Sequence, residues 1–309
     1  MPGDRWLRPI VRRLVRGRPR PGGLDKVLIN LRLGLDRLGI SYEVNLPFGR
    51  LRPDDLVGVL GRGRHCLQGY DRRQPLVAGI GLMTHPSEWP TLFEDYPVAC
   101  YLQHSEWTAA VYRRYFGDRC PIWPVGIDTV AWQPERQDGK SIDFLVYDKI
   151  HWGRPGYERD LLGPIGASIK LLGRTQMTLR YGAYEPGEYR SALARSRAVI
   201  FLSAHESQGI ACEEAMAAGV PILAWDPGRC QDPERFRWGD PDIPTTSVPY
   251  FDERCGRRFV DFADFERNLP TFMDAMQAGA YRPRDYILEN LTVEKCSRRF
   301  ADILHEKLS

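Results

Sequence analysis

The sequence lacks the patterns that mark a disulfide framework, a metal site or a membrane span. Its seven cysteines include no Cys-x-x-Cys pair, and its six histidines form no pair at metal-ligand spacing. No apolar run approaches the roughly 18 residues that a membrane span requires. The net charge of +3 is too small to indicate a nucleic-acid partner. These absences favour a metal-free protein of the reducing cytoplasm.

Arginine is concentrated at the amino-terminal end of the chain. Residues 1–20 contain seven arginines against one aspartate, and their apolar stretches are too short for a secretory signal. One interpretation is a basic arm that contacts anionic lipid at the inner face of the membrane. The other is a solvated arm, and the sequence leaves both open.

The rest of the chain alternates short apolar runs with helical stretches. A length of 309 residues favours two domains. Apolar spacing predicts a helix over 24–38 that Gly39 ends, and residues 40–46 alternate as a strand would. The polar stretch 133–141 has no periodic apolar signal and predicts a linker.

This pattern predicts an α/β fold of two Rossmann-like domains that face a central cleft. We place a first domain over 21–134 and a second over 135–309. No clean apolar strand precedes Gly22 and Gly23, so we expect the first domain to be trimmed at its amino-terminal side. The second ends in a helix for which Thr292 is the candidate N-cap. Ligands of such sheets bind beyond the carboxyl ends of the strands, so the cleft is the candidate site.

The segment 201–226, "FLSAHESQGIACEEAMAAGVPILAWD", contains a strand, a polar loop and a helix that Gly219 ends. The first amides of such a helix form an anion site, and Gly209 allows the backbone to approach a phosphate closely. We therefore expect the loop to hold a diphosphate, through the residues Ser207, Gln208, Gly209 and Ile210.

Two glutamates flank this turn at different depths. Glu206 lies just outside it, where a carboxylate can accept hydrogen bonds from hydroxyls beside the phosphate. Glu214 lies about one helical turn further in, where it can accept both hydroxyls of a ribose. Glu213 takes that role if the helix has a different register. The arrangement is suited to a nucleoside-diphosphate sugar.

Glu206 and Glu214 are separated by seven residues and followed by "AMAAGVPILA". This resembles the E-x(7)-E signature of GT-B-fold glycosyltransferases, especially the retaining family-4 type. "GGLDKVLINLRLGLDRLGISYEV", "WPVGIDTVAWQP" and "LRYGAYEPGEYRSALARSRAVIFLSAHE" are similar to other family segments, in the same order. The resemblance covers most of residues 21–300.

The resemblance also implies roles for side chains in other loops. A basic pair in the first loop of the second domain neutralises the leaving diphosphate, and "FLVYDKIHWGR" offers Lys149 and Arg154. Only six of the 43 Lys and Arg residues are lysine, so a lysine after a buried strand stands out. The run "RYGAY" places Tyr181, Gly182 and Tyr184 near the base. On the acceptor side His85 is the candidate beside the reacting sugar, and His104 is its rival.

The function implied is transfer of a sugar from a nucleotide-diphosphate donor to a hydroxyl of a glycan or lipid-linked saccharide. The resemblance implies retention at the anomeric carbon and no metal or other cofactor, and surface polysaccharide or glycoconjugate synthesis is the expected setting. Catalysis would rest on Glu206, Lys149 and His85. The alternatives are an inverting GT-B transferase, a sugar-nucleotide epimerase, and a non-catalytic sugar-nucleotide-binding scaffold at the membrane.

Overall fold

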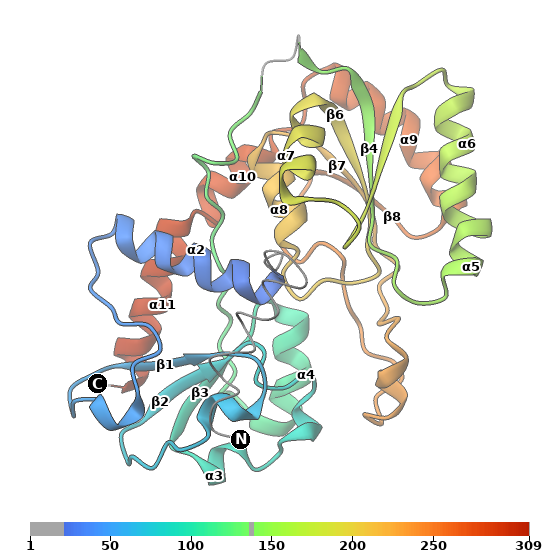
Figure 1. Cartoon of the computed structure of the whole chain (residues 1–309). Coiled ribbons are helices and arrows are strands. Elements are labelled where there is room, and N and C mark those ends of the chain that lie inside the picture. The colour runs from blue at the N-terminus through green and yellow to red at the C-terminus, as the bar shows by residue number, and fades with distance from the viewer. Residues whose placement is uncertain (1–21, 136–138, 309) are drawn as a thin grey trace, which may run out of the picture.

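The computed structural model describes residues 22–135 and 139–308, which form two parallel sheets (Figure 1). The first sheet has the order β1-β2-β3, and the second has the order β5-β4-β6-β7-β8. The strands are β1 (Val57–Leu60), β2 (Leu76–Gly79), β3 (Val98–Leu102), β4 (Ile142–Asp148), β5 (Gln176–Arg180), β6 (Ser196–Leu202), β7 (Ile222–Trp225) and β8 (Gly256–Phe259). The expected α/β fold with two sheet-based halves is confirmed. The basic arm 1–20 lies outside the described residues.

Helices cover both sheets. Those of the first half are α2 (Gly23–Arg37), α3 (Leu92–Asp95) and α4 (Glu106–Phe116), and the second half has α5 (Arg154–Tyr157), α6 (Gly163–Leu171), α7 (Pro186–Arg195), α8 (Ile210–Ala217), α9 (Phe262–Gln277), α10 (Pro283–Asn290) and α11 (Val293–Leu308). A single π-helical turn, Glu158–Leu162, joins α5 to α6. No helix in the described part of the chain is long and apolar enough to span a bilayer.

Helix α2 follows the predicted pattern, but the strand expected after it is absent. Val27, Leu31 and Leu35 are buried on one face of α2, and Gly39 ends the helix region with a φ of 65°. Residues 40–46 form no strand, so that prediction is wrong. Asn45 has a φ of 57°, which interrupts an extended backbone, and the segment is only half-buried or exposed.

The central strands of the second sheet are buried on both faces. Strand β4 pairs in parallel with β5 and with β6, and its residues 144–148 are all buried. Strand β6 is likewise apolar throughout residues 198–202. Near-continuous apolar runs are typical of parallel strands covered by helices on both sides. The loops that follow these strands at their carboxyl ends therefore meet at one edge of the sheet.

The carboxyl-terminal helix returns to the first half of the molecule. Thr292 caps α11 as predicted, since its Oγ1 accepts a hydrogen bond from the backbone N–H of Lys295 at 3.3 Å. Helix α11 then lies across α2 (Figure 1), and Phe300 and Ile303 join the core beneath β2 and β3. The last segment of the chain thus ties the two halves together.

A second link runs through the long connection between β7 and β8. In Figure 1 this connection descends beside α4. Its Trp238 stacks on His85 with the ring centroids 4.7 Å apart, and its Asp240 forms an ion pair with Arg114. Ile243 of the same connection is buried in the core of the first half. Sequence reasoning did not identify this contact.

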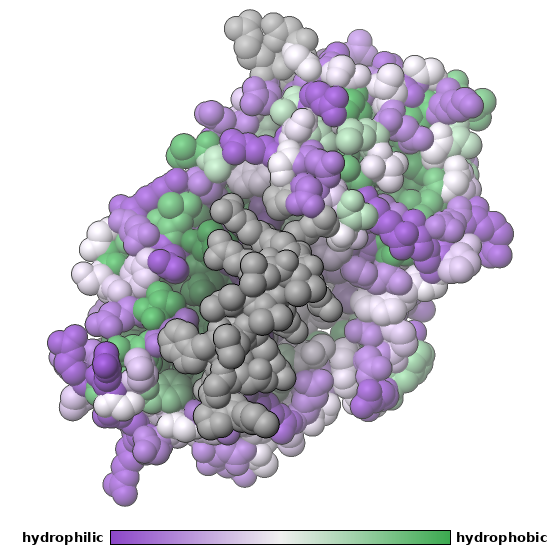
Figure 2. All heavy atoms as spheres, viewed as in Figure 1, coloured by the Kyte–Doolittle hydropathy of each residue, from purple (hydrophilic) through white to green (hydrophobic). Residues whose placement is uncertain are grey.

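The outer surface carries no obvious single apolar face in the view of Figure 2. Hydrophobic side chains there lie in small groups among hydrophilic ones, outside the grey atoms. Isolated apolar groups of this kind are ordinary on a protein surface.

Gly34 of α2 provides a test of the packing between α2 and α11. A Cβ at this position would overlap Ser297 Oγ and the Val293 carbonyl of α11. We expect Gly34→Ala to lower the free energy of unfolding by about 1 to 3 kcal/mol, because the backbone of α11 must move. Urea denaturation measures this loss.

The matched control is Gly187→Ala in α7, where a Cβ would meet nothing within 4 Å. It should leave stability unchanged or raise it slightly, because alanine favours the helix. Equal urea midpoints for the Gly34→Ala variant and the parent protein would show that the α2–α11 contact is not close-packed.

Candidate active site

A cavity of about 860 Å³ lies between the two halves of the molecule. Its walls come from the first turn of α2, the loops after β2 and β3, the loops after β4, β5 and β6, and the start of α8. Eleven of the twelve predicted site residues line it, namely His85, Lys149, Tyr181, Gly182, Tyr184, Glu206, Ser207, Gln208, Gly209, Ile210 and Glu214. The structure brings these residues together in one cavity, and their roles toward a ligand stay predictions.

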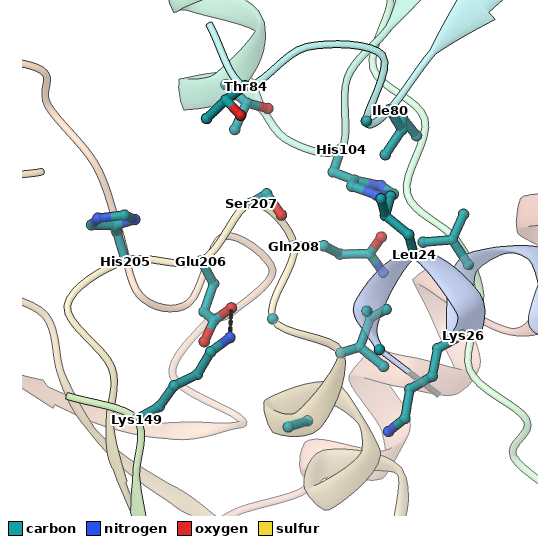
Figure 3. Close-up of a pocket in the computed structure, with 18 of the residues that line it drawn as sticks. Leu24, Lys26, Ile80, Thr84, His104, Lys149, His205, Glu206, Ser207 and Gln208 are labelled. Atoms are coloured by element: carbon teal, nitrogen blue, oxygen red, sulfur yellow. Dashed lines mark hydrogen bonds and ion pairs between the residues drawn. The ribbon is translucent and has the colours of Figure 1, made fainter. Parts of the chain in front are cut away.

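Glu206 is held by hydrogen bonds from two sides. Its Oε2 accepts a charge-assisted hydrogen bond from Lys149 Nζ at 2.7 Å (Figure 3), and its Oε1 accepts one from Ser203 Oγ at 2.8 Å. Trp107 of α4 donates its indole N–H to the Glu206 carbonyl at 2.8 Å, which joins the first half to this loop. Both carboxylate oxygens are thus oriented before any ligand arrives.

The turn that follows Glu206 leads into helix α8 through Gly209. Gly209 has a φ of 94°, a left-handed conformation that other residues rarely adopt. Gln208 does not point freely into the cavity, because it exchanges hydrogen bonds with both backbone groups of Val125 at 2.9 and 2.7 Å. Gln208 therefore anchors the loop to the first half of the chain.

The structure settles which of the two adjacent glutamates faces the cavity. Glu214 lines it, whereas Glu213 points into the interior and accepts a hydrogen bond from Gln208 Nε2 at 2.8 Å. Its other oxygen, Oε1, has no hydrogen-bond partner among the residues that the structure describes. Burial raises the pKa of Glu213 well above its ordinary value, which favours the uncharged form of the side chain. The register chosen from the sequence is correct.

Lys26 is the site residue that sequence reasoning missed. Its Nζ lies 2.6 Å from Glu214 Oε1 and 2.7 Å from Oε2, and in Figure 3 it projects from α2 beside α8. The two residues are 188 positions apart, so no local pattern could have paired them. The only available signal was the scarcity of lysine, which sequence reasoning applied to Lys149 alone.

Arg154 is the one predicted residue that does not line the cavity. Its guanidinium binds Asp148 with two hydrogen bonds of 3.2 and 2.8 Å and Glu158 with one of 2.7 Å. A bidentate arginine–carboxylate pair of this kind fixes the start of α5. Arg154 would have to leave both carboxylates to touch a ligand in the cavity.

The two candidate histidines lie at the first-half end of the cavity. His85 is buried, and its Nδ1 lies 2.7 Å from Ser87 Oγ. Its Nε2 has no hydrogen-bond partner in the described part of the chain. Burial lowers the pKa of His85, and it lowers the pKa of His104 to about 4. Both rings are therefore neutral near pH 7. His85 Nδ1 accepts the backbone N–H of Ser87 at 3.2 Å, so the proton of the neutral His85 ring lies on Nε2.

The described residues contain no group of three or more His, Cys, Asp or Glu side chains placed to hold a metal ion. The sequence has one Asp-x-Asp, at Asp240 and Asp242, and neither residue lines the cavity. Asp240 is paired with Arg114 instead. The expectation of metal independence stays a prediction.

No protein-family model and no curated protein matches the sequence. Solved structures do match. HepE of Anabaena, in complex with UDP and glucose, has a TM-score of 0.56 at 14% identity, over 93% of this chain and 97% of that one. A glycosyltransferase from Rickettsia africae has a TM-score of 0.57 at 10% identity, over 92% and 82%. WaaG, a glycosyltransferase of lipopolysaccharide biosynthesis, has a TM-score of 0.53 at 13% identity, over 93% and 96%.

The chain has the GT-B fold. The similarity spans both halves of each protein, so it includes the arrangement of the two sheets and not one sheet alone. In a GT-B fold the interdomain cleft lies at the carboxyl ends of the strands. The cavity lined by Glu206 and Glu214 occupies that position.

Glu213 gives a test of the interior of this site. Its raised pKa in the folded state means that folded protein binds more protons than unfolded protein once the pH exceeds the ordinary glutamate value. Stability should therefore fall as the pH rises from 5 to 8, by at most about 1.4 kcal/mol per pH unit for one group. Glu213→Gln removes this titration. The melting temperature of the variant, relative to that of the parent protein, should therefore increase as the pH rises.

Melting curves at several pH values measure the difference between the two proteins. The control is Glu266→Gln, an exposed position on α9, which should follow the parent at every pH. A constant difference between Glu213→Gln and the parent would mean that Glu213 is ionised in the folded protein.

Proposed function

We propose that the protein is a retaining glycosyltransferase that moves a sugar from a nucleoside-diphosphate donor to a hydroxyl of a glycan or lipid-linked acceptor. The observation that carries the proposal is the pair Glu206 and Glu214, which line one interdomain cavity on either side of a glycine-led helix start. The UDP and glucose bound by HepE, and the lipopolysaccharide pathway of WaaG, support the donor class and the setting.

The diphosphate would bind at the first turn of α8. Gly209 and Ile210 line the cavity there, and the amides of a helix start attract anions. Lys149 lines the same cavity and would stabilise the charge that grows on the leaving diphosphate. Arg154 would contribute directly only if its guanidinium left Asp148 and Glu158 and bound the donor instead.

The sugar and the nucleoside would bind on opposite sides of the diphosphate. Glu206 would orient the transferred sugar through its hydroxyls, and Glu214 would accept the ribose hydroxyls. Tyr181, Gly182 and Tyr184 would surround the base, with their backbone or rings lining that end of the cavity. Closure of the two halves would exclude water and limit hydrolysis of the donor.

The closest rival of the retaining reaction is an inverting one, which makes a different demand on the acceptor side of the cavity. An inverting reaction needs a base beside the acceptor, and the lining offers His85, His104 and, from the β7–β8 connection, Asp232. Asp232 caps a short helix by accepting the N–H of Glu234 at 2.9 Å. In the retaining proposal His85 assists the acceptor, and analysis of the product anomer decides between the two.

The expected setting follows from the same reasoning. A cytoplasmic enzyme at the inner face of the membrane, with the arm 1–20 in contact with anionic lipid, would meet lipid-linked acceptors where they are assembled. No metal or other cofactor is required, because Lys149 and the α8 amides meet the charge of the leaving group.

Donor binding is the direct test of this proposal. Thermal unfolding of the full chain in UDP, ADP, GDP and dTDP, and then in the corresponding sugar nucleotides, should show one preferred nucleotide. A ligand at about 100 times its Kd stabilises the folded state by about 2.7 kcal/mol, a clear shift in Tm.

Absence of any shift would contradict a nucleotide-sugar site. Slow hydrolysis of the preferred donor by the purified protein argues against a non-catalytic scaffold, and a change of the sugar without acceptor would indicate an epimerase.

Substitution of Glu214 and substitution of Glu206 should have different effects on UDP affinity and on kcat. Glu214→Gln should weaken UDP binding roughly tenfold or more, because a hydrogen bond to a charged group contributes about 1.5 to 3 kcal/mol. It should also abolish the preference for UDP over 2′-deoxy-UDP, while kcat changes little, because the ribose is bound alike in ground and transition states. Glu206→Gln should lower kcat strongly and not weaken UDP, because it orients the reacting sugar.

Calorimetry with both nucleotides and steady-state kinetics measure these effects. If Glu214→Gln keeps the full preference for UDP over 2′-deoxy-UDP, Glu214 does not bind the ribose.

A further inference from the structure

The ion pair between Lys26 and Glu214 spans the cleft. Lys26 belongs to α2 of the first half, and Glu214 belongs to α8 of the second. Lys26 Nζ bonds both carboxylate oxygens, at 2.6 and 2.7 Å. The Glu214 side chain is 4% exposed and that of Lys26 is 33% exposed, so the carboxylate is buried while the ammonium reaches the cavity.

Among the described residues, the other groups around Glu214 do not balance its charge. Tyr184 and Tyr189 face it from the loop before α7 and from α7 itself, and Glu213 is its neighbour in α8. Arg284 of α10 reaches α8, but its guanidinium is bonded to the carbonyls of Ala217, Trp132 and Thr129. Burial raises the pKa of Glu214, and Lys26 acts in the opposite direction.

We propose that Lys26 is a positioning residue that reaches across the cleft to hold Glu214 as an oriented carboxylate for the ribose of the donor. This inference rests on the proposed function, in which Glu214 accepts the ribose hydroxyls. It adds that the first domain, through Lys26, supplies part of the ribose site. Donor binding and the closed arrangement of the two halves then depend on each other.

Lys26 does not compete with the ribose for the carboxylate. Each carboxylate oxygen has two lone-pair sites, and Lys26 occupies one on each oxygen. Within 22–135 and 139–308 no other hydrogen bond reaches either oxygen, so one site on each remains, which matches the two hydroxyls of a ribose. A protonated Glu214 would lose this match, because one oxygen would become a donor.

The experiment measures UDP binding by calorimetry at several pH values between 6 and 8. The variants are Lys26→Met, Lys26→Gln and the charge-preserving Lys26→Arg. The control is Arg62→Met. It removes a cation that pairs, at 2.7 Å, with Asp25, the neighbour of Lys26 in α2. Parent protein must bind UDP first, or ADP or GDP if either of these is preferred, and failure there counts against the proposed function alone.

Lys26→Met and Lys26→Gln should bind UDP with a steeper pH dependence than the parent. Without Lys26 the pKa of Glu214 rises further, and the competent carboxylate becomes scarcer as the pH falls. Affinity should fall up to about tenfold per pH unit below that pKa. The phosphate of UDP titrates identically for every variant, so the comparison between variants isolates Glu214. Lys26→Arg and Arg62→Met should follow the parent.

Two results would overturn the proposal. Lys26→Met and Lys26→Gln with the affinity and pH profile of the parent would show that Glu214 needs no partner. Equal weakening at every pH would show that Lys26 binds the nucleotide itself. The excess pH dependence should vanish in Lys26→Met/Glu214→Gln, and its persistence there would also contradict the proposal. Circular dichroism of each variant confirms that it is folded.

Discussion

The two glutamates in the wall of the cleft each require a cation, and this requirement connects the parts of the site. Lys149 meets Glu206 from within the second half, and Lys26 meets Glu214 from the first half. Leaving a buried charge without a partner costs several kcal/mol, so each glutamate and its lysine stabilise one another. Two of the six lysines in the chain therefore lie at this one cavity.

Helix α8 explains how one segment supplies both a ligand surface and its support. Its residues 212–217 are all buried, so only its first turn and Glu214 reach the cavity. Consecutive residues of a helix point about 100° apart, which sends Glu213 into the interior. There Glu213 meets Gln208, and Gln208 in turn holds Val125, so the shape of the loop is fixed from behind.

Local sequence signals predicted the features that depend on neighbouring residues. The helix that follows Gly209, the capping Thr292 and the presence of Glu214 in the cavity wall are all features that short patterns indicate. The prediction of a strand over 40–46 was wrong because an alternating pattern does not guarantee a neighbouring strand to pair with. Lys26 and the β7–β8 connection were missed because their contacts join segments more than 100 residues apart.

The balance of charge in the cavity limits how a donor can bind there. Its lining in the described residues has two lysines against the carboxylates Glu206, Glu214 and Asp232, so a diphosphate would enter a cavity with no excess of cations. On the proposed function, sugar hydroxyls that bind Glu206 would release Lys149 toward the leaving diphosphate. Lys149 has three N–H donors and can bond Glu206 and a phosphate oxygen together, but it could turn further toward the leaving oxygen once the sugar hydroxyls bind Glu206. Correct placement of the sugar would then help to supply the charge that assists departure of the diphosphate.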